Sequence, residues 1–282
     1  MTDQRHDDGH EDGSFIRDLA RLQRRRAVLG LLAAGGVGAA VWGFGRAAAG
    51  GEANLFGTAA DGTQCLKLPS ETAGPFPADG TNRLDGATVN VLTEAGVMRR
   101  DLRGGIGGQG PVADGVPMDL ELALVDVGRA CAPMAGLAVY LWHCDAAGVY
   151  SIYGAREASW LRGMQESDAS GIVRFTTIFP GTYRGRWPHM HFEVFASADA
   201  AVSGRAALLT SQIAFPGDAV AAVYAGDARY AESRQPFAEQ SLSRDMVFSD
   251  NTPEQLGAQT LRIAGGIGSG LKGRVVIGLQ PA

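Results

Sequence analysis

The sequence is poor in histidine and cysteine, and this scarcity excludes several common kinds of metal site. Its 282 residues include five histidines and three cysteines. They do not form the closely spaced Cys and His sets that bind structural zinc. A metal centre in this chain must therefore draw on other side chains as well.

The sequence also lacks an excess of positive charge. It has 25 Lys and Arg against 30 Asp and Glu, for a formal net charge of -5. No basic stripe of the kind that binds nucleic acid is visible, so we expect no nucleic-acid partner. Hydrophobic residues make up 45% of the chain, which is enough to bury a globular core.

Long helical periodicity is scarce, and alternation of period two takes its place. Short alternating runs separated by turn residues predict an all-β fold, a β-sandwich with long irregular loops. The predicted strands are 118–127, 137–144, 171–179, 189–196, 207–215 and 273–279.

The N-terminal 50 residues have the composition of an export signal. Arg25 and Arg26 precede a mildly apolar, Gly- and Ala-rich stretch, which is the arrangement of a twin-arginine signal. We therefore predict a signal over 1–50, a linker over 51–64 and a catalytic domain over 65–282. The protein would then act outside the cell or in the cell envelope. The alternative is an uncleaved membrane anchor over 27–45, and this segment would be the only membrane contact.

The cysteines of an exported protein can form disulfides. Cys131 lies beside a turn and Cys144 ends the next apolar run, so a Cys131–Cys144 bridge would close a short loop. Cys65 has no obvious partner. The alternative is that these are buried free thiols.

Two of the five histidines stand one residue apart, in "WPHMHFEV". On a strand, His189 and His191 would project from the same face and could converge on one metal. A polar edge strand facing water would show the same pattern. Glu193 continues this face and is a possible third ligand of a two-histidine, one-carboxylate site, although a straight strand carries it away.

Tyrosine is the other available donor near this pair. Tyr183 precedes His189 by six residues, and Tyr150 follows the 137–144 strand. A phenolate is a hard anionic ligand that only a strong Lewis acid keeps deprotonated at neutral pH. Ferric iron does so, and tyrosine is one of its protein ligands.

Several segments in order resemble the intradiol ring-cleavage dioxygenases, the family of the catechol and protocatechuate 3,4-dioxygenases. They are "LPSETAGPFP" (68–77), "LWHCDAAGVYSIY" (141–153), "GTYRGRWPHMHFEV" (181–194) and "TSQIAFP" (210–216). The resemblance runs over about 65–280 and fits the exported, single-chain members.

The resemblance implies roles for individual residues. Tyr150, Tyr183, His189 and His191 match the ligands of a non-haem Fe(III), and Tyr153 is the rival of Tyr150. Tyr183, Arg186 and Gln212 match catalytic positions, while Gly74, Pro75 and Phe76 match a segment that shapes the substrate pocket.

The implied reaction is intradiol cleavage of a catechol-type aromatic by O2 to a cis,cis-muconate-type product, by a monomer or homodimer. The link between Tyr183 and His189 is shorter than in many family members, which would open the site to larger catechols.

Arg156, Arg162 and Arg184 are expected to be solvated charges, each able to meet a substrate carboxylate. The alternative function is a metal-free β-sandwich module that binds polysaccharide or a protein partner.

Overall fold

The computed structural model describes residues 55–280 of the chain. The strands are β1 (Phe56–Thr58), β2 (Gln64–Leu66), β3 (Asp79–Leu84), β4 (Ala87–Asn90), β5 (Pro117–Asp126), β6 (Ala132–Pro133), β7 (Ala138–Trp142), β8 (Arg162–Glu166), β9 (Ile172–Ile178), β10 (His189–Phe195), β11 (Leu209–Ala214), β12 (Arg262–Gly266) and β13 (Gly270–Leu279). The helices are α2 (Ala198–Val202), α3 (Gly217–Gly226), α4 (Ala231–Ala238) and α5 (Pro253–Gln259), with 3-10 turns η1 (Ile106–Gly108), η2 (Val127–Arg129) and η3 (Ala228–Tyr230).

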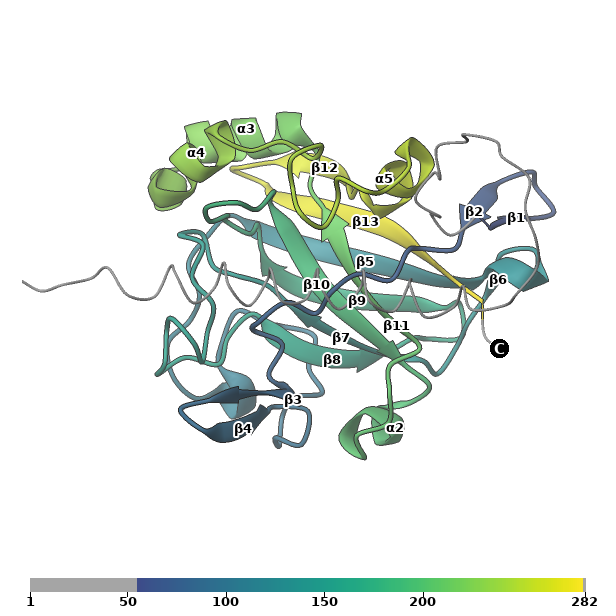
Figure 1. The fold of residues 1–282 in the computed structure, drawn as a ribbon, viewed down its shortest axis with the longest axis horizontal. Helices are drawn as coiled ribbons and strands as arrows, with labels where there is room; N and C mark the ends of the chain where they lie inside the picture. The colour runs from purple at the N-terminus through teal and green to yellow at the C-terminus, as the bar shows by residue number, and fades with distance from the viewer. Residues whose placement is uncertain (1–54, 281–282) are drawn as a thin grey trace, which may run out of the picture. The chain divides into compact units, whose positions relative to one another are not determined.

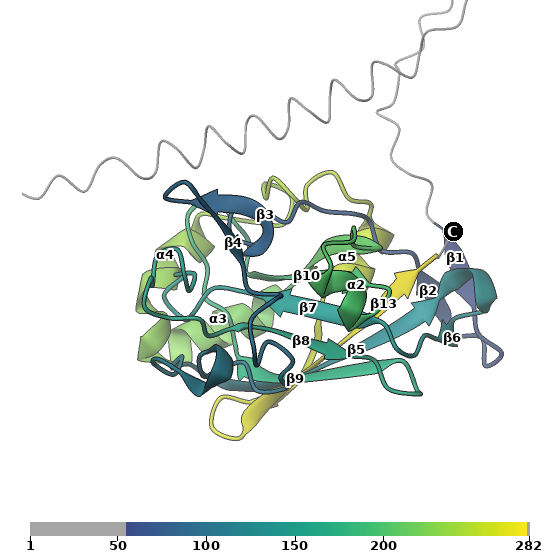
Figure 2. The ribbon, with the colours of Figure 1, turned by 90° about the horizontal axis from the view of Figure 1, so that it is seen from below.

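Two sheets form the framework. One has the order β11-β10-β7-β8, and the other has the order β12-β13-β5-β6 with β9 on the second edge of β5. Figure 1 shows β13 and β5 above β7 and β8, and Figure 2 shows α3 and α4 together at one end and β1 and β2 at the other. All six predicted strands are present, and the predicted β-sandwich is confirmed.

The main core lies between the sheets and follows from the alternation of each strand. On β10, Met190, Phe192 and Val194 belong to this core, together with Leu120 and Leu122 of β5. The intervening residues of β10 are therefore directed to the opposite face of the four-stranded sheet.

That opposite face is also buried, against a second apolar cluster. Tyr140 and Trp142 of β7 pack there with Val91 and Leu92, which follow the β3–β4 hairpin. Figure 1 shows this hairpin on the side of β7 and β8 away from β13. The polar side chains at 189, 191 and 193 are thus enclosed rather than facing water, as a polar edge strand would require.

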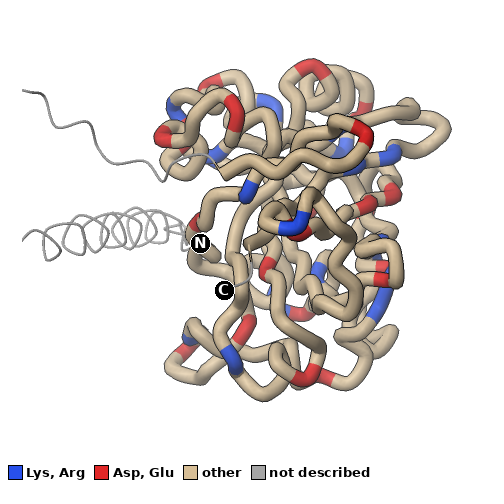
Figure 3. The backbone as a smooth tube through the Cα atoms, turned by 90° about the vertical axis from the view of Figure 1, so that its right-hand side faces the viewer, with Lys and Arg blue, Asp and Glu red and all other residues tan. Residues whose placement is uncertain are grey.

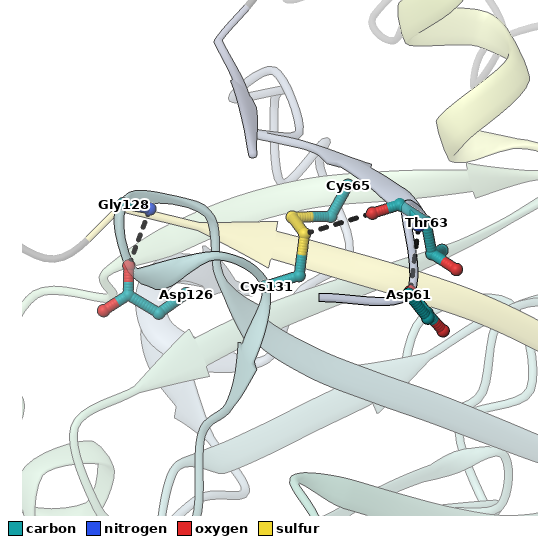
Figure 4. The surroundings of a disulfide bond; sticks show 6 residues. All are labelled: Asp61, Thr63, Cys65, Asp126, Gly128 and Cys131. Atoms are coloured by element: carbon teal, nitrogen blue, oxygen red, sulfur yellow. Dashed lines mark hydrogen bonds between the residues drawn. A yellow bond between two sulfur atoms is a disulfide. The ribbon is translucent and has the colours of Figure 1, made fainter. Parts of the chain in front are cut away.

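The disulfide joins Cys65 to Cys131, with their Cα atoms 6.0 Å apart, and Cys144 is a buried free thiol. The predicted Cys131–Cys144 bridge is wrong. Figure 4 shows the reason: a turn held by Asp61, which accepts from the Thr63 backbone N–H, brings Cys65 onto the η2 turn beside Cys131. Cys144 instead continues β7 into the interior, where its thiol donates to the Gly181 carbonyl oxygen.

The segment predicted as a linker, 51–64, contains a short strand. Phe56–Thr58 forms β1, which pairs antiparallel with β2, and the disulfide attaches β2 to the sandwich. The predicted export signal over 1–50 lies outside the described residues. Within 55–280, no helix is both long enough and apolar enough to cross a membrane.

Charges of both signs are interspersed along the tube in Figure 3. On the outer face of the five-stranded sheet, Arg174 pairs with Asp168 at 3.0 Å and with Glu121 at 3.3 Å. These side chains are 29–46% exposed, so we expect each pair to contribute less than about 1 kcal/mol to folding stability.

Candidate metal site

Four donor atoms converge on the outer face of the four-stranded sheet. The Nε2 atoms of His189 and His191 are 3.1 Å apart, and the Tyr150 hydroxyl lies 3.0 Å from Nε2 of His191. The Tyr150 and Tyr183 hydroxyls each lie 3.5 Å from Nε2 of His189. The structure therefore brings together all four predicted ligands.

The imidazole of His189 is oriented by its own backbone. Its Nδ1 lies 2.5 Å from the Trp187 carbonyl oxygen, which can only accept, so Nδ1 carries the proton. The lone pair of Nε2 is thereby directed at the other donors. Burial holds the pKa values of His189 and His191 well below the usual value, so both imidazoles are neutral.

The two tyrosines come from different loops. Tyr150 follows β7, and its ring is 3% exposed, whereas Tyr183 lies in the loop between β9 and β10 and is partly exposed. Burial raises the pKa of both phenols, most strongly that of Tyr150. Both therefore stay protonated at neutral pH unless a cation stabilises the phenolate.

The donor set fits a small, highly charged cation. Ligands about 2.1 Å from a metal and 90–110° apart lie roughly 3.0–3.4 Å from each other, close to the separations seen here. Nδ1 of His191 is buried without a hydrogen-bond partner, so its ring is oriented by packing and by the donor cluster. Two neutral imidazoles and two phenolates suit ferric iron, which prefers anionic oxygen ligands.

Arg186 lies beside this cluster and is 4% exposed. Its Nη1 is 3.1 Å from Nε2 of His189, and its Nη2 donates to Oε1 of Gln212 at 2.6 Å. Gln212 in turn donates to the Thr72 carbonyl oxygen at 2.8 Å. The predicted catalytic positions 186 and 212 thus form one hydrogen-bonded unit at the donor cluster.

Asp245 completes this unit and was not predicted from the sequence. Its Oδ2 accepts from Nε of Arg186 at 3.0 Å and from the Trp187 backbone N–H at 2.6 Å. Oδ1 accepts from the backbone N–H groups of Val247 and Phe248. In the sequence, the only sign of a buried, paired carboxylate at this position is that Asp245 directly precedes three apolar residues, in "DMVF".

The predicted pocket segment also reaches the site. Gly74 has φ +70°, and a Cβ there would approach Cε1 of His191 to 3.3 Å, so the chain passes directly over the imidazole. Phe76 packs 5.0 Å from the ring of Tyr150. The Pro75 carbonyl oxygen accepts from Asn82, which fixes the segment to β3.

Tyr153 and Glu193, the two alternative ligands, form hydrogen bonds outside the donor cluster. The Tyr153 hydroxyl accepts from the Ala78 backbone N–H at 3.1 Å and from Asn82 at 2.5 Å. Oε1 of Glu193 accepts from the Thr210 hydroxyl at 3.1 Å. No group of three His, Cys, Asp or Glu side chains within residues 55–280 could hold a metal, so a site here depends on tyrosine.

Surface hollows are also present away from this site. Two cavities, of about 420 and 440 Å³, are lined by residues of the five-stranded sheet and α3 and by none of the predicted site residues. The first contains ion-paired surface charges such as Arg174 and Glu121. Volume alone therefore does not identify the site; the convergence of buried donors does.

Comparison with known proteins supports this assignment. A family model described as "Dioxygenase" matches residues 110–263, just over half of the chain. The chain belongs to this family. The predicted resemblance to the intradiol ring-cleavage dioxygenases is confirmed. A comparison with curated proteins gave no match.

Two of the solved structures that resemble this dioxygenase share its fold. An intradiol ring-cleavage dioxygenase from Tetranychus urticae is 21% identical, with a TM-score of 0.58 over 77% of this chain and 96% of that one. Dioxygenase Tetur07g02040 is 22% identical, with a TM-score of 0.57 over the same shares. Catechol 1,2-dioxygenase from Pseudomonas arvilla C-1 is 23% identical, with a TM-score of 0.46 over 76% of this chain and 62% of that one.

Proposed function

We propose that this dioxygenase uses a non-haem Fe(III) and O2 to cleave a catechol-type aromatic between its two hydroxylated carbons, releasing a cis,cis-muconate-type product. Family membership makes it an oxidoreductase and supports ring cleavage of a catechol. The observation that carries the proposal is the convergence of Tyr150, Tyr183, His189 and His191 beside a buried Arg186. The alternative of a metal-free binding module leaves this convergence unexplained.

The four donors would hold the iron, and bound Fe(III) would supply the Lewis acidity that ionises the catechol and makes its ring reactive toward O2. Tyr183 is the more exposed phenol, so it is the one placed to accept a proton from an incoming hydroxyl. Arg186 is permanently charged and stabilises negative charge that develops on the ring. Gly74 and Phe76 bound the space over His191 and Tyr150.

The size of the substrate follows from the link between Tyr183 and His189. Arg184 and Gly185 in this link are exposed, so the edge of the site beside Tyr183 is open to solvent. We infer that catechols with large substituents are accepted. Comparable kcat/KM for catechol and for a catechol with a bulky ring substituent would support this, whereas a loss of about a hundredfold for the larger one would refute it.

The visible spectrum of the iron-loaded protein tests the metal site. We expect a broad tyrosinate-to-iron band that shifts when a catechol is added without oxygen. Tyr150→Phe and Tyr183→Phe should each abolish or strongly shift the band. Tyr153→Phe is the matched control, because its hydroxyl bonds to Ala78 and Asn82 instead. A protein that binds iron but shows no such band would exclude the tyrosines as ligands.

Ring cleavage is tested by its product. Aerobic turnover of catechol should yield a muconate-type dicarboxylate containing both atoms of labelled O2, and Arg186→Ala should keep the band but lose turnover. Full turnover in that variant would remove its assigned role.

Export remains a separate proposal. We infer that residues 1–50 direct the folded protein through the twin-arginine route. Replacement of Arg25 and Arg26 by Lys should retain it in the cytoplasm, and unchanged export would contradict the signal. Sedimentation of the purified protein will distinguish the proposed monomer from a homodimer.

A further inference from the structure

Arg162 is a fully buried guanidinium two strands away from His191 in the four-stranded sheet. It begins β8, is 0% exposed and pairs in register with Trp142 of β7, whose ring stacks on His191. No carboxylate within residues 55–280 forms an ion pair with it. The expectation of a solvated surface charge is therefore wrong for this residue. Burying an unpaired charge is costly, so its hydrogen bonds must compensate.

Those hydrogen bonds reach two segments that are far apart in the sequence. Nε and Nη2 donate to Oγ and the carbonyl oxygen of Ser151, at 3.0 and 3.2 Å. Nη1 donates to the Pro77 carbonyl oxygen at 3.0 Å and lies 3.3 Å from the Tyr140 hydroxyl. Tyr140 itself donates to the same Pro77 oxygen at 2.8 Å. Ser151 follows the predicted ligand Tyr150, and Pro77 follows the predicted pocket residues 74–76.

The backbone beside each contact is strained. Ile152, next to Ser151, has φ +73°, and Ala78, next to Pro77, has φ +54°. Leu161, next to Arg162 itself, has φ +56°. A β-branched residue such as Ile152 rarely adopts positive φ, and such conformations persist only where surrounding contacts enforce them. The guanidinium contacts the residue beside each strained position, and the Ala78 backbone N–H also donates to the Tyr153 hydroxyl.

We propose that Arg162 is a positioning residue that holds the Tyr150 loop and the 74–77 segment in one fixed arrangement. The planar fork of arginine suits this role, because its several donors reach both carbonyl groups simultaneously. The functional roles of the two segments rest on the proposed function. The Tyr150 loop would carry an iron ligand, and the 74–77 segment forms the wall facing His191. Without Arg162, we expect both segments to loosen, although the Tyr153–Ala78 hydrogen bond and the packing of Phe76 would still join them.

The matched control is Arg99, a neighbouring guanidinium that donates only to backbone oxygens. Its side chain bonds to the carbonyl oxygens of Arg162, Gly104 and Ser159, and so braces the 101–106 loop. It makes no hydrogen bond to Pro77 or Ser151. Loss of Arg99 should therefore lower stability without separating the two segments.

Hydrogen exchange of the iron-free protein is the primary test. In Arg162→Lys and Arg162→Met, the amides of 150–155 and of Ala78 should lose protection together, by at least about tenfold, with a smaller loss in the Lys variant. Arg99→Lys should weaken protection over 101–106 instead. Equal losses at 150–155 in the Arg99 and Arg162 variants, or no loss in the Arg162 variants, would overturn the proposal.

The unsubstituted chain provides a test that needs no variant. If Arg162, together with the Tyr153–Ala78 hydrogen bond, joins the two segments, the amides of 150–155 and Ala78 should share one opening equilibrium and respond alike to low denaturant. Opening of either segment at a protection tenfold below the other would contradict the proposal.

The functional readout separates positioning from stability. In iron-loaded protein, Arg162→Met should shift the tyrosinate band and lower kcat for catechol by about tenfold or more, with Arg162→Lys intermediate and Arg99→Lys unchanged. A native spectrum and kcat in both Arg162 variants would overturn the role. If the unsubstituted protein shows no band and no turnover, the proposed function fails, while the exchange experiment still decides whether Arg162 joins the segments.

Discussion

The indole of Trp142 lies flat against the imidazole of His191, with ring centroids 5.0 Å apart and planes 7° apart. The two residues are opposite each other on β7 and β10, so the sheet register itself fixes the contact. Because Nδ1 of His191 has no hydrogen-bond partner, this stack is a main constraint on the orientation of its ring.

Removal of the stack should weaken metal binding. The loss of iron affinity should be larger than destabilisation of the fold alone would explain. We expect Trp142→Leu to lower iron affinity by about tenfold, because the orientation of His191 is no longer fixed. Trp142→Phe keeps an aromatic ring and loses only an indole N–H that is already unpaired, so its affinity should stay near that of the natural protein. Iron titration of the three proteins measures this.

Phe175→Leu is the control for this prediction. Phe175 is a fully buried core residue of β9, and its loss should reduce stability without affecting the metal. Equal iron affinity in Trp142→Leu and Phe175→Leu would mean that the stack does not orient His191.

Asp245→Asn should both destabilise the protein and impair turnover. The substitution leaves Arg186 as an uncompensated buried charge, for which we expect a loss of about 3–5 kcal/mol in the free energy of unfolding. Asp101→Asn, which breaks an exposed pair with Arg103, should cost less than about 1 kcal/mol. Urea denaturation of iron-free proteins gives both values, and similar losses would contradict the difference expected from burial.

The strands and the placement of His189 and His191 on one strand face were predictable from the sequence because their signals are local. Alternation within 189–195 predicts a strand and places His189 and His191 on one face, as the structure has them. The short signature around them also named Tyr183 and Arg186. The shared face of the two histidines follows from strand geometry, whereas Tyr150, Tyr183 and Arg186 were named by the family resemblance.

The supporting contacts were not predictable, because each joins distant segments. Arg162 contacts Pro77 and Ser151, and Asp245 contacts Arg186, 59 residues away. Nothing in the composition around Arg162 distinguishes a buried brace from a surface charge. The disulfide prediction was wrong for the same reason, since proximity in sequence favoured Cys144 whereas the fold brings Cys65 to Cys131.

Acid should destabilise the fold through His143, a buried residue outside the metal site. Its Nδ1 donates to the Cys144 carbonyl oxygen, and its Nε2 accepts from the Thr177 hydroxyl, so the neutral ring is fully bonded. Burial lowers the pKa of His143 from 6.5 to about 4. Its contribution is therefore fully present above pH 6.5 and is lost as pH falls toward 4, because the unfolded chain binds the proton first.

The size of this effect is up to about 3 kcal/mol across that interval. His143→Gln can keep both hydrogen bonds but cannot titrate, so the difference in stability between the two iron-free proteins should shrink as pH falls from 6.5 to 4. His189 and His191 titrate in both proteins and cancel in the comparison. A difference that is independent of pH would show that His143 is not the group responsible.

Reduction of the Cys65–Cys131 disulfide should lower stability by about 3–4 kcal/mol, because the bond joins residues 66 apart and so restricts the unfolded chain. Cys65→Ser and Cys131→Ser should cause the same loss and make the protein insensitive to reductant. Cys144→Ser is the control: its thiol is buried and unbridged, so this variant should remain sensitive. Thiol titration should find one group in the oxidised protein, reactive only after denaturation. If Cys144→Ser instead removes the sensitivity to reductant, Cys131 is paired with Cys144 after all, and β1 and β2 are attached to the sandwich by packing alone.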